Sequence, residues 1–129
     1  MARRPRKIPE TPNSRLFLGF EHAGLHPNKR SADEIAAWYK NAFGFTVTEE
    51  AASLFLSGSG TGRLEIMKDT DEKTRMHIAI RVSNFEEAVA ALQARGIPLK
   101  EPLIGPDLKI VYLQETDPEG NPVHLWWAS

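Results

Sequence analysis

The stretch MHIAIRVSNFEEAVAALQARGIP, residues 76–98, predicts a strand that is followed directly by a helix. Residues 76–82 carry an aliphatic side chain at every second position, which is typical of a strand with one buried face. Ser83 and Glu86 have the spacing of a capping box, and the apolar residues after them recur at helical spacing. Gly96 is placed to end the helix.

The first half of the chain has the same order of elements. Residues 16–25 predict a strand, and Ser31 and Glu34 form a second capping box. Gly44 is placed to end the helix that follows. The apolar stripe of this helix consists of Ile35, Trp38, Tyr39, Ala42 and Phe43.

Each predicted helix is followed by three short strand-like runs. They cover residues 45–48, 53–57 and 63–67 in the first half, and residues 97–100, 109–114 and 122–127 in the second. The chain therefore repeats a βαβββ module, with module one at residues 16–67 and module two at residues 76–127, inside a single domain of residues 16–129. We expect an α+β fold whose aliphatic strand faces pack on the two helices.

The overall composition is that of an ordinary globular protein. Hydrophobic residues make up 41%, charged residues 26%, and the formal net charge is −1. Nothing in the charge balance indicates a nucleic-acid partner, and no apolar run approaches the ~20 residues of a membrane span. The chain has no cysteine, so any metal site must use nitrogen and oxygen ligands. We expect a cytoplasmic protein without a nucleic-acid or membrane partner.

The one biased stretch is the beginning of the chain. Residues 1–15 are rich in arginine and proline and contain a single acidic residue, Glu10. We interpret them as a basic N-terminal arm. A solvated tail is the favoured interpretation, and an arm that contacts nucleic acid is the alternative.

Four polar residues occupy equivalent positions in the two modules. His22 and His77 lie in the first strands, and Glu65 and His124 lie between aliphatic residues in the last strands. Because side chains alternate along a strand, all four should point away from the helix-covered face. A single histidine on a strand is more often a structural residue than a metal ligand. The prediction of a metal site therefore rests on the joint arrangement of all four residues. Three imidazoles and one carboxylate suit one borderline divalent ion.

Two arginines share the face of the predicted metal ligands. Arg63 lies on the side of Glu65, and Arg81 lies on the side of His77. Both are candidate substrate-binding residues, because a guanidinium matches the geometry of an anionic group. The alternative is that they are counter-charges for Glu65 and its neighbours, and the sequence leaves both possibilities open.

Two further side chains near the predicted ligands have alternative interpretations. Trp126 is a candidate for stacking on a substrate, and packing in the core or an interface is the alternative. His26 lies four residues beyond His22, which is about 13 Å along a regular strand. That distance would exclude His26 from the ion's shell and place it at the rim or on the surface.

Four stretches carry a resemblance to a known superfamily. They are FEHAGL (20–25), WYKNAFGF (38–45), MHIAI (76–80) and DPEGNPVHL (117–125). Over residues 17–127 the sequence resembles the vicinal oxygen chelate superfamily of glyoxalases, extradiol dioxygenases, epimerases, and fosfomycin and bleomycin resistance proteins. The resemblance implies two βαβββ modules whose eight-stranded mixed sheet forms a cup. It also implies a metal held by His22, Glu65, His77 and His124.

The resemblance further implies a range of activities. One ion of nickel, zinc, iron, cobalt or manganese would chelate two neighbouring oxygens of a small-molecule substrate, and a lyase, isomerase or epimerase would act through an enediolate. The family usually has glutamate where this chain has His124. By symmetry between the modules, proton transfer then falls to Glu65. The alternatives are a ring-cleaving iron dioxygenase and a non-catalytic drug-binding protein of the bleomycin-resistance type.

Many small members of this superfamily complete the cup across a dimer. The link between the modules, residues 68–75, is polar and short for bringing two modules face to face within one chain. We therefore expect a homodimer in which His22 and Glu65 of one chain meet His77 and His124 of the other.

Overall fold

The computed structural model describes residues 15–68 and 76–129. The predicted arm up to residue 14 and the link at 69–75 lie outside the described residues. The described elements, in chain order, are β1 (Phe17–Leu25), α1 (Ala32–Phe43), β2 (Thr46–Glu50), β3 (Ser53–Ser57), β4 (Arg63–Met67), β5 (Met76–Val82), α2 (Phe85–Ala94), β6 (Leu103–Ile104), β7 (Leu108–Tyr112) and β8 (Val123–Ala128). The α+β expectation is confirmed.

The first helix is capped as its sequence predicts, and the second begins one residue later. Ser31 accepts a hydrogen bond from the backbone of Glu34, and Gly44 ends α1 in the left-handed conformation. The cap of α2 is Asn84, not Ser83. Ser83 is still paired with the start of β1, because its backbone donates to Leu16 and its hydroxyl donates to the carbonyl of Arg15. Asn84 is then the first residue available to cap the helix.

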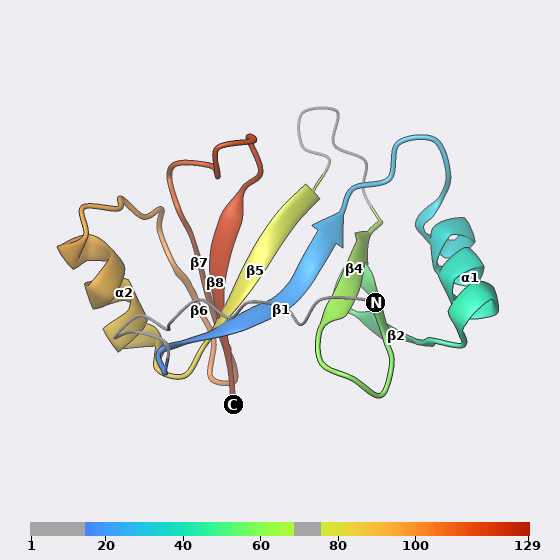
Figure 1. The fold of residues 1–129 in the computed structure, drawn as a ribbon, viewed down its shortest axis with the longest axis horizontal. Coiled ribbons are helices and arrows are strands. Elements are labelled where there is room, and N and C mark those ends of the chain that lie inside the picture. The colour runs from blue at the N-terminus through green and yellow to red at the C-terminus, as the bar shows by residue number, and fades with distance from the viewer. Residues whose placement is uncertain (1–14, 69–75) are drawn as a thin grey trace, which may run out of the picture.

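The strands form one open eight-stranded mixed sheet in the order β2-β3-β4-β1-β5-β8-β7-β6. β1 is parallel to β4, β5 is parallel to β8, and the central pair β1 and β5 is antiparallel. The two modules are therefore joined edge to edge within one chain, and the helices lie at opposite ends of the molecule (Figure 1). The run at residues 97–100 contributes only an isolated bridge, from Leu99 to Leu113, and β6 takes the edge position.

This topology corrects the expectation that two chains are needed to bring the modules together. Leu25 at the end of β1 pairs with Ile66 of β4 on one side and with Met76 of β5 on the other. The end of β4 and the start of β5 are thus only two strand spacings apart, about 10 Å. A short link is sufficient for this edge-to-edge arrangement. A homodimer remains a prediction.

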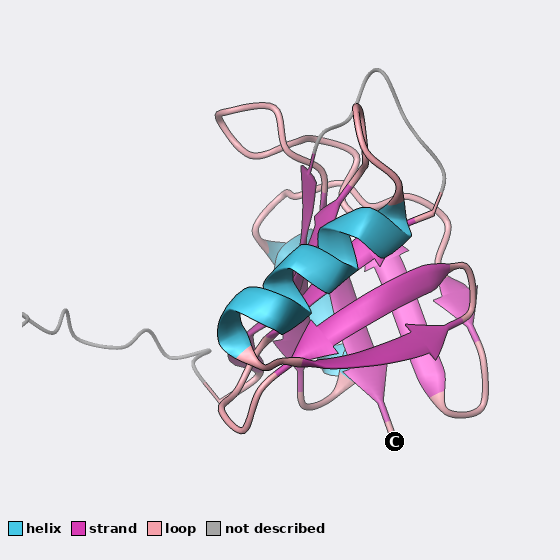
Figure 2. Ribbon diagram, turned by 90° about the vertical axis from the view of Figure 1, so that its right-hand side faces the viewer, coloured by secondary structure: helices cyan, strands magenta, loops and turns pink. Residues whose placement is uncertain are grey.

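Each helix covers the aliphatic face of its own module. α1 packs through Ala36 against Leu56 and Ile66 of β3 and β4, and Figure 2 shows this helix lying across the strands of module one. α2 packs through its own apolar face against β5, β7 and β8. The opposite face of the sheet has no helix over it among the described residues. Neither helix has the length and apolar character that a membrane span requires.

Candidate metal centre

The four predicted ligands lie in two rows across the centre of the sheet. Each row has two of these residues and a small residue between them: Glu65, Gly24 and His77 in one row, and His22, Ala79 and His124 in the other. Side chains that are neighbours across paired strands point to the same face. The pairing of β1 with β5 therefore brings all four predicted residues together within a single chain.

The two small residues allow the larger side chains to converge. Ala79 is completely buried, and the rings of His22 and His124 on either side of it have centroids only 5.5 Å apart. At Gly24 the ring of His77 occupies the space of the missing side chain, since a Cβ there would lie 1.8 Å from Cε1 of His77. The sequence analysis missed Gly24. A glycine inside a strand is the signal that could have found it.

The three imidazoles form a buried cluster. His22, His77 and His124 are each at most 4% exposed, and one ring nitrogen of each lies within 4.8 Å of the others. Oε1 of Glu65 lies 3.3 Å from Nε2 of His22 and 3.0 Å from Nε2 of His77. The carboxylate therefore lies on the inner side of two of the rings.

Each ring has its other nitrogen engaged by a neighbouring group. Nδ1 of His22 bonds to the carboxylate of Glu21, and Nδ1 of His124 donates to the carbonyl of Leu125 at 3.0 Å. Nδ1 of His77 lies 3.4 Å from Nε2 of His26. Outer partners of this kind orient metal-binding histidines and leave Nε2 as the ligand atom. The three nitrogens and one carboxylate therefore fit a divalent ion.

His26 lies outside the group of three ligand histidines, as the sequence predicts. Its ring centroid lies 5.5 Å from that of His77, so it contacts the cluster from its rim. β1 ends at Leu25, so His26 is not held to the rise of a regular strand. Leu25 is also paired with the start of β5, which brings the end of β1 next to His77.

Glu21 is a second residue that the sequence analysis missed. A regular strand would place adjacent Glu21 and His22 on opposite faces. The register of β1 against β5 shifts between Phe20 and His22, so Glu21 is the extra residue of a β-bulge. The bulge lets its carboxylate reach the ring of His22. Strand periodicity contains no signal for this contact.

The sequence of this chain matches a known protein superfamily over most of its length. The family model of the Glyoxalase/Bleomycin resistance protein/Dioxygenase superfamily matches residues 28–125. The chain belongs to this superfamily. No curated protein matches the sequence at a significant level.

Solved structures with the same superfamily fold align over most of the chain. Methylmalonyl-CoA epimerase from Mycobacterium tuberculosis has a TM-score of 0.74 at 19% identity, covering 88% of this chain and 90% of that one. A Streptomyces coelicolor methylmalonyl-CoA epimerase variant in complex with 2-nitronate-propionyl-CoA has a TM-score of 0.67 at 20% identity, covering 88% and 99%. A hypothetical protein from Bacillus halodurans has a TM-score of 0.67 at 17% identity, covering 85% and 94%. At these identities the likeness shows the fold alone.

Arg63 acts as a counter-charge in this member of the glyoxalase superfamily. Its Nε and Nη2 donate to Oε1 of Glu21 at 3.0 and 2.9 Å, and its Nη1 donates to Glu50 at 2.7 Å. The guanidinium also lies 3.9 Å from the centre of the Phe55 ring. Neither of these acidic partners is Glu65, the carboxylate that the sequence offered as a partner for Arg63.

Hydrogen bonds between the carboxylates and the imidazoles of the site shift the pKa values of both kinds of group. Burial alone would raise the pKa of Glu65, but hydrogen bonds from His22, His77 and Ser53 outweigh it and hold that pKa well below its ordinary value. Burial alone would lower the pKa of His22, but its hydrogen bonds to Glu21 and Glu65 raise it. Glu65 is therefore ionised near neutral pH.

The side of the site formed by His124 and its aromatic neighbours is less polar than the side formed by the carboxylates. Burial lowers the pKa of His124 to about 4, so this ring is neutral near pH 7. Neutral imidazole is the form that binds metal. Burial, together with the charge of Glu65, raises the pKa of Tyr112, whose ring packs against His124 with centroids 4.7 Å apart. The ring of Trp126 forms a T-shaped contact with that of His22, with centroids 5.1 Å apart.

The role of Glu21 leads to a testable prediction for this superfamily member. Glu21→Ala should weaken zinc or nickel binding by about 10- to 100-fold without removing it, because the ring of His22 loses the partner that orients it. Competition with a chelating dye measures the affinity. Glu49→Ala is the matched control, since Glu49 pairs with Lys68 and contacts none of the three rings. Equal losses in both variants would contradict the assigned role.

Proposed function

We propose that this protein is a divalent-metal-dependent isomerase or lyase that moves a proton at a carbon next to a carbonyl group. The observation that carries the proposal is the convergence of His22, His77 and His124 in one buried cluster, with the half-buried carboxylate of Glu65 against two of the rings. Each ring of the cluster has Nδ1 bound by an outer partner. This donor set, and membership of the glyoxalase superfamily, support metal-assisted chemistry.

We assign the four residues complementary roles. His22, His77 and His124 would hold the ion through their inner ring nitrogens. A divalent ion bound there supplies a Lewis acid that polarises a carbonyl oxygen and stabilises the negative charge developed on deprotonation. Glu65 is the carboxylate on the inner side of the rings, so we assign it proton transfer. Its lowered pKa keeps it in the ionised form, which accepts a proton.

Aromatic side chains surround this cluster and limit the access of water. The rings of Phe55 and Trp126 both form T-shaped contacts with the ring of His22, and Tyr112 packs against His124. A water-poor environment strengthens electrostatic stabilisation of a developing negative charge. The same walls favour a substrate that has an apolar or planar part beside its chelating oxygens.

The substrate class remains a proposal as well. The solved structures that align with the chain include proteins named methylmalonyl-CoA epimerase. We therefore propose a carboxyacyl thioester as the first class to assay. An epimerase would remove the proton from the carbon between the two carbonyl groups and return a proton to the opposite face.

Exchange of a substrate proton with deuterium oxide tests the proposal. Protein loaded with one nickel, cobalt, zinc, manganese or ferrous ion should catalyse the exchange at that carbon, followed by mass spectrometry. Glu65→Gln should slow the exchange by at least about 100-fold, the scale of general acid–base catalysis. Glu50→Gln is the control, because Glu50 contacts Arg63 and none of the rings.

Two outcomes would contradict the assignment. Unchanged exchange in a metal-loaded Glu65→Gln variant would remove the proton-transfer role of Glu65. No exchange with any of these ions on carboxyacyl thioesters or α-hydroxycarbonyl compounds, combined with oxygen uptake on catechols, would favour the dioxygenase alternative.

A further inference from the structure

A cavity of about 590 Å³ opens beside the candidate metal centre. Its walls come from the first half of β1, from the turn between β3 and β4, and from Arg81 on β5. It shares Glu21 and Arg63 with the hydrogen-bond network that supports His22. The cavity therefore adjoins the residues that support the metal centre.

The two arginines that line the cavity differ in their charge environment. Arg63 is neutralised by two carboxylates, those of Glu21 and Glu50. Arg81 is exposed, and its side chain forms no hydrogen bond or ion pair within residues 15–68 and 76–129. The cavity thus holds one guanidinium whose charge is not balanced by the residues that the structure describes.

Pairing across the sheet places Arg81 next to the metal centre. Arg81 is the neighbour of Gly19 on β1 and of Trp126 on β8. It lies two residues beyond Ala79 on β5, which is about 7 Å from the row that contains His22. Because Gly19 has no side chain, the space over β1 beside Arg81 stays open.

The surroundings of Arg81 combine charge with apolar surface. Leu18 and Phe20 flank Gly19 and are 52% and 76% exposed, which is unusual for residues of a central strand. The turn opposite them contains Gly60, Thr61 and Gly62, which present backbone groups and one hydroxyl. This combination suits an anionic group attached to an apolar or planar segment.

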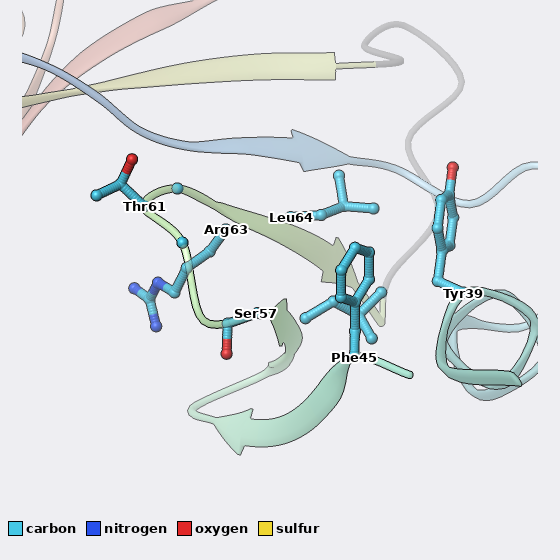
Figure 3. Close-up of a pocket in the computed structure, with 10 residues that line it drawn as sticks. Tyr39, Phe45, Ser57, Thr61, Arg63 and Leu64 are labelled. Atoms are coloured by element: carbon cyan, nitrogen blue, oxygen red, sulfur yellow. The ribbon is translucent and has the colours of Figure 1, made fainter. Parts of the chain in front are cut away.

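A second cavity behind the same turn lacks this combination. It has a volume of about 370 Å³ and is lined by Tyr39, Phe45 and Leu64 on the helix side of module one. Figure 3 shows Thr61 and Arg63 at the turn and Tyr39 across the cavity from them. Its one arginine is Arg63, whose charge is already balanced.

We propose that Arg81 binds a terminal carboxylate or phosphate group of an elongated substrate whose other end lies at the metal centre. Leu18 and Phe20 line the same cavity and would supply apolar surface beside the bound molecule. The inference rests on the proposed function for the metal end, and it narrows the substrate class to molecules with a second anion remote from the chelating oxygens. Carboxylate and phosphate share the bidentate geometry that guanidinium binds.

Binding of small aromatic anions to the metal-free full-length chain tests the subsite. Phenyl phosphate and phenylacetate would be titrated into isotope-labelled protein from which metal has been removed, so that neither anion can bind an ion. Amide signals of residues 19–21, 60–62 and 81 should shift. Arg81→Ala should weaken binding by at least about tenfold, the scale of a hydrogen bond to a charged group, and Arg81→Lys should lose less.

The control removes another exposed arginine. Arg30→Ala deletes the same charge near α1, where Arg30 pairs with Glu34, and should leave both affinities unchanged. Tighter binding of phenyl phosphate identifies a phosphate group, and tighter binding of phenylacetate identifies a carboxylate; either supports the subsite. Equal affinities in wild type and Arg81→Ala, or shifts confined to His22, His77 and His124, would overturn it. Because the protein is metal-free, the result is independent of deuterium exchange.

Discussion

Gly24→Ala is expected to abolish stoichiometric metal binding and to destabilise the protein. The added methyl group would lie 1.8 Å from Cε1 of His77, so the ring must leave its position. Overpacking a close-packed site costs about 1–3 kcal/mol of stability. The displaced ring would also lose its contact with Glu65. Metal content after dialysis, and urea unfolding of the metal-free chain, measure the two effects.

Two further variants separate this clash from a general sensitivity to glycine replacement. Gly60→Ala is the matched control, because a Cβ there meets no atom within 4 Å and its φ lies outside the left-handed region. It should retain metal. The double variant Gly24→Ala, His77→Ala removes the clashing ring, so its unfolding free energy should approach that of His77→Ala alone. Normal metal content in Gly24→Ala would refute the proposed packing.

His22→Ala and His77→Ala should each lose nearly all metal, and mixing the two variants should not restore it. His22 and His77 of one metal site come from the same chain, because β1 and β5 pair within that chain. Every site in a mixture would then lack one imidazole. Metal content after co-refolding an equal mixture measures the outcome, and native mass spectrometry verifies whether mixed oligomers form.

The mixing experiment distinguishes the two architectures even if the protein is a dimer. Chains that exchanged modules would pair His22 of one chain with His77 of the other, and mixed dimers would then contain one intact site. Recovery of metal in proportion to the mixed dimers would therefore contradict the single-chain site. The double variant His22→Ala, His77→Ala, mixed with either single variant, is the control that should show no recovery in either architecture.

Much of the candidate site was predictable because its signals are local. Alternation along residues 76–82 indicated that His77 faces away from the helices, and the repeated module indicated that His22, Glu65 and His124 do the same. The structure brings these four side chains together. The roles of the three histidines in binding metal and of Glu65 in proton transfer remain proposals, which the metal-content and deuterium-exchange measurements test.

Other parts of the site depended on contacts between distant segments. A regular strand would place Glu21 on the face opposite His22, and only the bulge against β5 brings its carboxylate to that ring. The sequence also left open whether Arg63 binds substrate or balances a nearby carboxylate. In the structure Arg63 forms ion pairs with Glu50 on β2 and Glu21 on β1. The capping box at Ser83 was displaced by one residue because Ser83 pairs with the start of β1.

The sequence by itself determined both helices and every strand except β6, and which face of the central strands is polar, because periodicity and capping act between residues near one another in the chain. The tertiary structure decided how the modules join. The antiparallel pairing of β1 with β5 within one chain, in place of the expected exchange between two chains, aligns Gly24 with His77 and Ala79 with His22. That register creates the space in which the rings meet, and register depends on pairing between residues more than fifty positions apart, which no local pattern specifies.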